Sequence, residues 1–476
     1  MRSLEGSTIA STELEDFRSF IRSLIAPIRS IPNEILGLVF ELYVDNRRLS
    51  LAYKDPIWLL TRVCRVWRKV ALSSPWLWTR IDTRRLPKYV PPKVKSRLGS
   101  VDMREVCDVL QSYLAHSRSL PLEINLYLWP SSRWKPVVQM LWEHRQRWQT
   151  LHCRGGRTQE LEQVRQEMSS DGLPVLRSYQ YASDGDAKDI AGLLCLLPAP
   201  KLRNLRLWGR CQTIDQSLPW SQITCYSGPA VTHAGHKILP LMTNLQSCVV
   251  HFIDFDYTTW GNSTCLFCPR LRVLSFYSHY EPHTCAAYIS APMLRKLCAT
   301  GDYQNPSYFI DISARHGSAL STLSIGYGCD DAVLYEIIKH CPTLRTLVLR
   351  QSPARIPAGT IWRPIFAQLK DTPALFSHLI VLKVVPVFNR STQEINAQVA
   401  DAMQLVKTLL ALDTRCLQAV HFHGVNVEST RRMLDQEFAT VIDNVKVTVH
   451  GRGEYQHADD FGELVRLPLL ADSVHA

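Results

Sequence analysis

The chain of 476 residues lacks the motifs that mark the common classes of enzyme. It has no GxxxxGK[ST] phosphate loop, no GxGxxG turn, no HExxH helix and no GxSxG nucleophile turn. It also lacks paired carboxylates framed by a supporting motif, and any RING-like array of Cys and His. We therefore expect no catalytic residues, no cofactor and no resident metal. The sequence predicts a protein that acts by binding, not an enzyme.

Long hydrophobic runs are also missing. The longest apolar stretch, Ile190 to Pro200, is much shorter than the roughly 20 residues that a membrane-spanning helix needs. The opening residues, MRSLEGSTIASTELEDF, do not have the basic-then-apolar order of a signal peptide. We predict no membrane association and a cytoplasmic or nuclear location. In that setting the 14 cysteines are expected to be buried thiols and not disulfides.

Low-complexity segments are absent, and the composition (46% hydrophobic, 20% charged) is that of a globular protein. The net charge of +11 is uneven, because residues 1–100 hold 18 Lys/Arg against 9 Asp/Glu. This basic N-terminal part predicts an acidic partner surface, with a solvated basic surface as the alternative. No nucleic-acid-binding signature accompanies the charge, so we expect no nucleic-acid partner.

The first 80 residues have the spacing of a few short helices. An apolar stripe predicts an amphipathic helix within residues 1–30. Pro32 suits the start of a second helix, and Asp55-Pro56 suits the start of a third, which Ser73-Ser74-Pro75 ends. Helices this few and short cannot bury all their apolar side chains on one another. This region therefore predicts an apolar surface for a partner.

Three segments here resemble the F-box: IPNEILGLVF at 31–40, LLTRVCRVWRKVAL at 59–72 and SPWLW at 74–78. The lead-in helix resembles that of the large F-box families of mushroom-forming fungi. The resemblance implies an F-box over residues 31–80 that binds a Skp-type adaptor and, through it, a cullin–RING ubiquitin ligase. By match, the adaptor-binding candidates are Ile31, Pro32, Ile35, Leu36, Val63, Cys64 and Trp67, with Leu77 and Trp78 closing the module or extending the interface. The alternative for each residue is a place in the module's own core.

A second pattern fills the rest of the chain, after a predicted linker and connecting helix at 81–119. The sequence apolar-x-x-apolar-x-apolar returns at intervals that mostly lie between 23 and 28 residues, as in leucine-rich repeats. The copies begin at Trp148, Leu176, Leu202, Trp220, Leu245, Leu271, Leu294, Leu320, Leu344, Leu379 and Leu417. We predict an α/β fold in which residues 120–460 form an irregular leucine-rich-repeat horseshoe, a curved parallel sheet with outer helices, and residues 461–476 a tail. A compact α/β domain with coincidental strands is the alternative.

Strand positions between and after the two anchors are expected to face the concave side of such a sheet. Arg and aromatic side chains are favoured at binding hot spots, so this row predicts a recognition surface. The substrate-binding candidates are His152, Arg154, Arg206, Trp208, His251, Tyr277, Arg350, His421 and His423. The alternative is an ordinary solvated sheet face.

One spacing resembles a zinc finger: Cys265-x-x-Cys268 followed by His279-x-x-x-His283. Its central gap of ten residues is shorter than the usual twelve or so. The gap also contains repeat anchors, and CPRLRVL at 268–274 parallels CPTLRTL at 341–347. We therefore assign Cys268 to a repeat and predict no zinc site.

Taken together, these features predict a substrate-recognition subunit of an SCF-type ubiquitin ligase. Its helices would hold the Skp-type adaptor, and its repeats would hold an unknown protein substrate. Catalysis would then come from proximity to a ubiquitin-loading enzyme, with no chemistry from this chain. The alternative is a ligase-independent leucine-rich-repeat scaffold whose N-terminal helices only cap the repeats.

Overall fold

The computed structural model describes most of the regular structure of the chain. The described residues are 31–45, 55–83, 103–127, 135–154, 172–182, 198–208, 219–229, 238–252, 266–278, 289–301, 307–326, 331–350, 376–385, 392–411, 416–439 and 445–451. The helix predicted within 1–30 and the tail predicted at 461–476 lie outside them. The chain divides into two compact units, Met1–Cys153 and Arg154–Ala476, a later division than the boundary at residue 120 suggested by the repeat pattern.

The first unit begins with short helices. They are α2 (Asn33–Asp45), α3 (Pro56–Val63), α4 (Arg65–Ser73) and the 3-10 helix η2 (Pro75–Trp78). The extended backbone of Cys64 separates α3 from α4, and its Sγ accepts a hydrogen bond from the Trp67 amide (3.5 Å) at the start of α4. Arg68 Nε donates to the carbonyl of Thr61 (2.8 Å), which satisfies the C-terminal end of α3. The VCxxW segment is therefore a capped break between two helices.

A small parallel sheet completes this unit. Its strands β1 (Arg80–Asp82), β2 (Leu122–Tyr127) and β3 (Trp148–Arg154) lie in that order. The helices α5 (Met103–His116) and α6 (Lys135–Glu143) and the 3-10 helix η4 (Arg145–Arg147) lie between them in sequence. Helix α5 is the predicted connecting helix. Strand β1 was not predicted, because residues 80–82 are too few to show a strand pattern; its pairing with β2 identifies them as part of the sheet.

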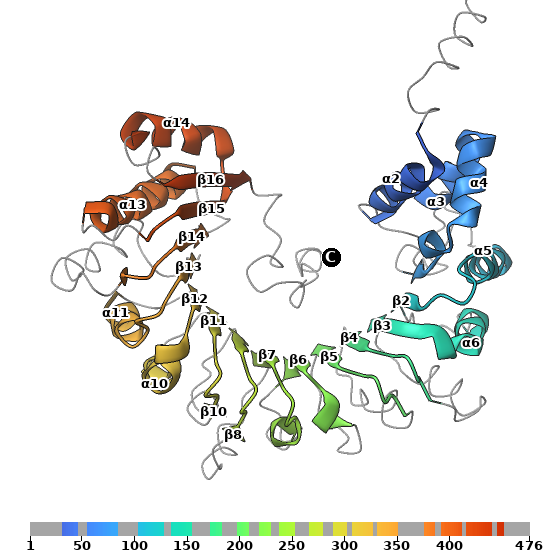
Figure 1. The fold of residues 1–476 in the computed structure, drawn as a ribbon, viewed down its shortest axis with the longest axis horizontal. Coiled ribbons are helices and arrows are strands. Elements are labelled where there is room, and N and C mark those ends of the chain that lie inside the picture. The colour runs from blue at the N-terminus through green and yellow to red at the C-terminus, as the bar shows by residue number, and fades with distance from the viewer. Residues whose placement is uncertain are drawn as a thin grey trace, which may run out of the picture. The chain divides into compact units, whose positions relative to one another are not determined.

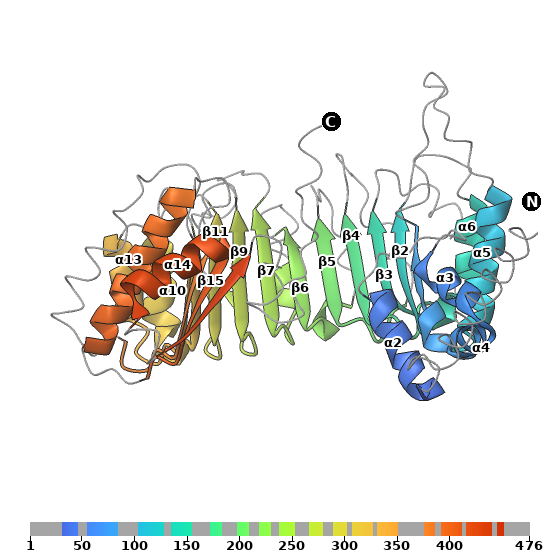
Figure 2. The same cartoon turned by 90° about the horizontal axis from the view of Figure 1, so that it is seen from above.

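The second unit contains one parallel sheet whose strands follow the order of the sequence. The strands are β4 (Ser178–Ala182), β5 (Asn204–Trp208), β6 (Cys225–Pro229), β7 (Ser247–Phe252), β9 (Val273–Ser278), β11 (Lys296–Gly301), β12 (Thr322–Gly326), β13 (Thr346–Arg350), β14 (Val381–Val385), β15 (Ala419–Val425) and β16 (Lys446–Gly451). Figure 2 shows the arrows of β5, β6, β7, β9 and β11 side by side and pointing the same way. The short strands β8 (Leu266–Phe267) and β10 (Ile289–Ser290) pair separately.

Helices of the second unit cover one face of its sheet. Figure 1 shows α10 (Ser307–His316), α11 (Asp331–Lys339) and α13 (Thr392–Ala411) on the outer side of its curve. Helix α14 (Val427–Glu437) follows β15, and short 3-10 helices η6 (Trp220–Gln222), η7 (Leu239–Leu241) and η9 (Gly317–Ala319) precede strands. The anchors Leu323, Leu347, Leu382 and Val420 face the helices and are buried. The prediction of a repeat-like α/β fold with a curved parallel sheet is confirmed.

A turn at the start of each repeat explains the spacing of the pattern. The amide of Leu294 bonds to the carbonyl of Ala291, Leu320 to Gly317, and Leu344 to Cys341, at 3.0–3.2 Å. The first Leu of each copy therefore follows a tight turn and enters the core. The residue after this Leu donates its amide to the carbonyl of the equivalent residue one repeat earlier, as Ser321 does to Arg295 (2.9 Å).

The described cysteines are free thiols, and the expectation that they are buried holds for part of them. Those that are buried are Cys153, Cys248, Cys268, Cys298 and Cys341, whereas Cys107, Cys225 and Cys416 are half-buried and Cys64 is exposed. Burial raises the pKa of the Cys341 thiol to about 12, so it stays protonated. Across the described ranges we find no helix with both the length and the apolar character needed to cross a bilayer.

A buried histidine at the end of α10 makes this region sensitive to acid. His316 Nε2 lies 3.3 Å from the amide nitrogen of Ala291 and 3.4 Å from the carbonyl oxygen of Ile289. Burial lowers the pKa of His316 below its ordinary value of 6.5, and Arg315 lowers it further, while the Ile289 carbonyl acts the other way. The unfolded chain therefore binds a proton at higher pH than the folded chain, so stability is present above about pH 6.5 and is lost below it.

We expect the free energy of unfolding to fall between pH 7.5 and 5.5, and to fall less in His316→Gln, whose amide keeps a polar atom near the Nε2 position but does not titrate. Urea unfolding at several pH values measures this difference. An equal pH dependence in the two proteins would contradict the assignment.

Candidate interaction surfaces

An aromatic cluster forms the interior of the first unit's helical part. Trp78 is fully buried, with its ring centroid 5.0 Å from that of Trp58 and 5.2 Å from that of Tyr113. Its Nε1 donates to the carbonyl of Ala71 (2.9 Å), and Tyr113 Oη donates to Asp55 Oδ2 (2.8 Å). Burial raises the pKa of Tyr113 well above 10, and the carboxylate of Asp55 raises it further. The hydroxyl of Tyr113 therefore stays protonated and donates the hydrogen bond. These contacts tie α3, α4 and η2 to α5.

Burial divides the predicted adaptor-binding set. Leu36, Leu77 and Trp78 are buried at 0–3% exposure, so they lie in the interior of the helical part, a position that for Leu77 and Trp78 fits the predicted role of closing the module. Trp67 is half-buried, and its ring meets that of Phe40 edge-on at 4.9 Å. The alternative stated for each residue, a place in the module's own core, holds for these three.

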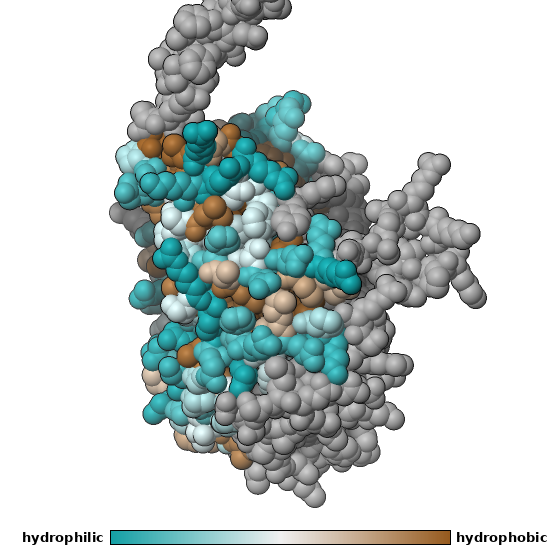
Figure 3. Space-filling model, turned by 90° about the vertical axis from the view of Figure 1, so that its right-hand side faces the viewer, coloured by the Kyte–Doolittle hydropathy of each residue, from teal (hydrophilic) through white to brown (hydrophobic). Residues whose placement is uncertain are grey.

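An apolar face remains uncovered on the same helices, and we call it the exposed helical face. Its members are apolar side chains with 44–63% exposure: Ile35, Leu38, Val39 and Leu42 on α2, Leu59 and Val63 on α3, Val66 on α4 and Trp76 on η2. In Figure 3, hydrophobic surface appears among hydrophilic side chains near the top of the view, where these helices lie. An apolar concentration of this kind on a small module is typical of a protein-interaction surface.

The predicted candidates lie partly on this face. Ile35 and Val63 belong to it, Pro32 and Cys64 are exposed, and Ile31 is half-buried. The candidate set did not include the other members of the face: Leu38, Val39, Leu42, Leu59, Val66 and Trp76. The spacing of Ile35, Leu38, Val39 and Leu42 was the available signal, because it forms one helical stripe while Leu36, Phe40 and Val44 form another.

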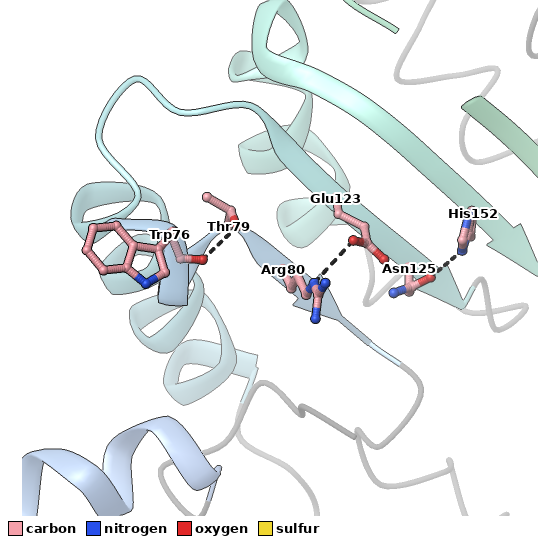
Figure 4. A network of polar contacts seen from close by, with 6 residues as sticks. All are labelled: Trp76, Thr79, Arg80, Glu123, Asn125 and His152. Atoms are coloured by element: carbon pink, nitrogen blue, oxygen red, sulfur yellow. Dashed lines mark hydrogen bonds and ion pairs between the residues drawn. The ribbon is translucent and has the colours of Figure 1, made fainter. Parts of the chain in front are cut away.

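A polar strip crosses the small sheet of the first unit (Figure 4). Thr79 Oγ1 donates to the carbonyl of Trp76 (2.8 Å), and Arg80 Nε pairs with Glu123 Oε2 (3.2 Å) on the neighbouring strand. His152 Nδ1 lies 2.7 Å from Asn125 Oδ1. The predicted candidate His152 is thus part of a hydrogen-bonded row on the sheet. Its partners hold it in position, as they would in an ordinary solvated sheet face.

The inner face of the second unit's sheet, opposite the helices, has a described row of side chains at its centre. The strand register aligns small or apolar side chains at its centre, and all are at most 6% exposed: Ser227, Val249, Ser275, Cys298, Ser324 and Val348. Among the described side chains of this row, no Arg and no aromatic lies between Ser227 and Val348. The half-exposed residues of the same row are Gln180 and Arg206 near one end and Lys383 and His421 near the other.

The remaining substrate-binding candidates lie on the strands, as predicted. Arg154, Arg206, Trp208, His421 and His423 are half-buried, and burial lowers the pKa of Arg206. The backbones of His251, Tyr277 and Arg350 belong to β7, β9 and β13, but their side chains lie outside the described residues. The described candidates of the second unit therefore come from strands at the two ends of its sheet.

The described residues contain no group of three or more His, Cys, Asp or Glu arranged to hold a metal ion. Cys268 is buried beside the anchor Leu271, whose amide bonds to its carbonyl (3.2 Å). It therefore belongs to the repeat, as the sequence suggested. The other three members of the finger-like spacing, Cys265, His279 and His283, lie outside the described residues.

Comparison with known proteins adds little to this geometry. No protein-family profile matches the chain, and no curated protein matches its sequence. Among solved structures, it is similar to the crystal structure of a structural-genomics target protein from Bacteroides fragilis, with 14% identity and a TM-score of 0.31. That similarity covers 66% of this chain and 78% of the other.

Proposed function

We propose that this chain is a substrate-recognition adaptor of an SCF-type cullin–RING ubiquitin ligase. The helical part of residues 31–80 would be an F-box that binds a Skp-type adaptor, and the leucine-rich-repeat-like unit would bind a protein substrate. The chain itself would supply no catalytic group and need no cofactor. The observation that carries this proposal is the exposed helical face, whose apolar side chains lie on the helices that resemble an F-box.

Physical chemistry supports a partner for that face. Apolar area gains about 25 cal/mol per Å² when it leaves water, so these side chains favour association. The aromatic cluster holds α3, α4 and η2 against α5, so the helices that carry most of the face are fixed in position. Interfaces gain affinity from preorganised surfaces, because little ordering is needed on binding.

The substitution Leu38→Glu tests the proposal. Leu38 lies mid-helix on α2 at 55% exposure, so Glu is accommodated without loss of core packing but places a charge in the interface. We expect binding to a purified Skp-type adaptor to weaken at least about 30-fold, the loss of one hot spot of roughly 2 kcal/mol. Calorimetric titration measures the affinity, and thermal unfolding is expected to be unchanged within about 2 °C.

Phe267→Glu is the matched control, because Phe267 is an apolar residue of the second unit with 66% exposure. It receives the same charge and is expected to leave adaptor binding unchanged. Equal affinities for wild type and Leu38→Glu would contradict the proposed interface. A folded wild-type chain that binds no Skp-type adaptor would contradict the ligase function and favour the ligase-independent scaffold.

A further inference from the structure

The tight turns that precede the strands of the second unit form one edge of its sheet, which we call the turn edge. In each five-residue turn the fourth residue donates its amide to the carbonyl of the first, as Leu271 does to Cys268 (3.2 Å). The turns before β4 to β14 are residues 173–177, 199–203, 220–224, 242–246, 268–272, 291–295, 317–321, 341–345 and 376–380. They hold seven Lys/Arg and no Asp or Glu, and all seven basic side chains are exposed. Because the parallel strands begin on the same side of the sheet (Figure 2), this charge gathers along one edge.

The backbone ladder continues through these turns and brings arginines together. The amide of Arg295 bonds to the carbonyl of Arg272 (2.8 Å), and the amide of Arg203 bonds to the carbonyl of Arg177 (2.9 Å). Neighbouring strands are about 4.8 Å apart, so each pair places two arginines on adjacent repeats. A guanidinium group can bind a carboxylate through two parallel hydrogen bonds. The turn edge therefore has the chemistry of an acidic-ligand site.

The described contacts of these arginines are with neutral groups. Arg270 Nη1 donates to Asn244 Oδ1 (2.7 Å), and Arg295 Nη1 donates to the carbonyl of Ala319 (3.3 Å). Within the described ranges, no Asp or Glu forms an ion pair with Arg270, Arg272 or Arg295. Neutral partners orient these side chains but do not neutralise their charge. The charge remains available to an anionic ligand.

Apolar side chains are exposed in the middle of the same edge. Leu241, Phe267 and Met293 are 40%, 66% and 43% exposed, and in the described part of the second unit they are the exposed large apolar residues. Each lies in a turn or directly before one, in the repeats of β7, β9 and β11. Helix η7, which ends at Leu241, lies against β8, which ends at Phe267 and pairs with β10. Apolar residues gathered in this way on successive repeats favour a protein ligand.

We propose that the turn edge binds an acidic segment of another protein, and that this segment also carries apolar side chains. The apolar side chains of the segment contact the exposed Leu, Phe and Met, and its carboxylates pair with the arginines of the same repeats. A single-stranded nucleic acid matches the charge but not the apolar residues, because two of these three are aliphatic and its bases bind by stacking on aromatic rings.

The length of the edge indicates the length of the ligand. Arg203 and Arg345 precede β5 and β13, which are six strand spacings apart in the sheet, about 29 Å. An extended segment covers roughly 3.3 Å per residue, so about nine residues span this distance. The central part of the segment meets the apolar residues, and both of its ends meet basic ones.

The site gives the proposed protein substrate a place and a chemical class, and this link alone rests on the ligase function. Binding of an acidic segment does not need the F-box assignment, because every residue of the turn edge belongs to the second unit. Variants of the turn edge are expected to bind a Skp-type adaptor with unchanged affinity. Failure of either proposal can therefore be recognised separately.

Fluorescence anisotropy with the full chain tests the basic part of the site. The probe is a labelled synthetic peptide of about twelve residues in which Glu and Leu alternate, long enough to span the edge. We expect Arg272→Glu combined with Arg295→Glu to weaken its binding at least about tenfold, because both changes place carboxylates where the ligand needs cations. Thermal unfolding within about 2 °C of wild type checks that the variant folds.

Lys339→Glu combined with Arg431→Glu is the matched control, because both residues are exposed on α11 and α14 and the change in net charge is the same. We expect this control to change the peptide affinity by less than about twofold, because salt screens distant charges. A similar loss in the two variants would show attraction by overall charge and would overturn the site. A wild-type chain that does not bind the peptide would overturn it as well.

Phe267→Ser combined with Met293→Ser tests the apolar part and keeps every arginine. Both side chains are exposed, so the fold does not depend on them. We expect peptide binding to weaken at least about tenfold, as for the loss of hot-spot residues. An oligothymidylate that binds wild type as tightly as the peptide does, or a peptide affinity unchanged in the Ser variant, would show a general polyanion surface. Either result would overturn the assignment to a protein segment.

Discussion

Trp78→Ala is expected to destabilise the first unit by about 4 kcal/mol, within the range for removing a fully buried Trp. The side chain has no exposed surface and contacts the rings of Trp58 and Tyr113. Its Nε1 also satisfies the carbonyl of Ala71, which the alanine variant leaves without that donor. Hydrogen exchange of the amides in α3, α4 and α5 measures the loss, because these helices meet at this residue.

Trp76→Ala is the matched control, two residues away on the same 3-10 helix. Trp76 is 47% exposed, so its removal is expected to change the stability by less than about 1 kcal/mol. It is expected to weaken binding of a Skp-type adaptor, because it belongs to the exposed helical face. If both variants reduce the hydrogen-exchange protection of α3, α4 and α5 equally, the assignment of Trp78 to the core and Trp76 to the surface is contradicted.

This pair shows what the sequence does and does not predict in the helical part. The resemblance predicted that Leu77 and Trp78 close the module or extend its interface, and Asp55-Pro56 predicted the start of α3. Which Trp would be covered depends on α5, a contact more than thirty positions away in sequence. The side chain of Asp55 likewise accepts from Tyr113 and does not cap α3, because the distant partner competes for it.

Helix α2 shows the same difficulty on a smaller scale. Its apolar residues occupy more than one side, so a single hydrophobic period does not separate the core stripe of Leu36, Phe40 and Val44 from the exposed stripe. The match to the F-box placed Ile35 and Leu36 in one candidate set, although one is exposed and the other is buried. An apolar stripe that binds a partner chain has the same local spacing as an apolar stripe that packs in the core of its own chain.

The repeat unit was predicted more fully, because residues close together in the sequence determine each repeat. Each copy of the pattern encodes a turn, two buried anchors and a parallel neighbour, so the strands that carry a copy, and their order, follow from the spacing. Strand β16 lies beyond the last copy, which begins at Leu417, and was not predicted. The burial of Ser275, Ser324 and Val348 on the inner face did not follow. The position of a residue on a strand determines which face of the sheet its side chain lies on. Whether that side chain is buried depends on residues that are distant in the sequence.

Gly317→Ala is expected to destabilise the second unit by about 2–3 kcal/mol, as for other insertions into a packed site. Gly317 is buried at the turn between α10 and β12, where other repeats have Ala291 and Cys341. An added Cβ would lie 2.2 Å from the carbonyl oxygen of His340 and 2.8 Å from its carbon. Both atoms are backbone at the end of the next repeat's helix, so relief requires a shift between neighbouring repeats.

Gly37→Ala provides the comparison, because a Cβ there would lie 3.6 Å from Trp76 Cζ2 and 4.0 Å from Ser74 Oγ, both ordinary contacts. Its helical position favours Ala by up to about 1 kcal/mol, so we expect no loss of stability. Urea unfolding and hydrogen exchange of β12 and β13 measure the effect of Gly317→Ala. If the stability of Gly317→Ala lies within about 0.5 kcal/mol of wild type, the His340 carbonyl can move aside with little loss of free energy. The close approach of the two repeats would then not require glycine at this position.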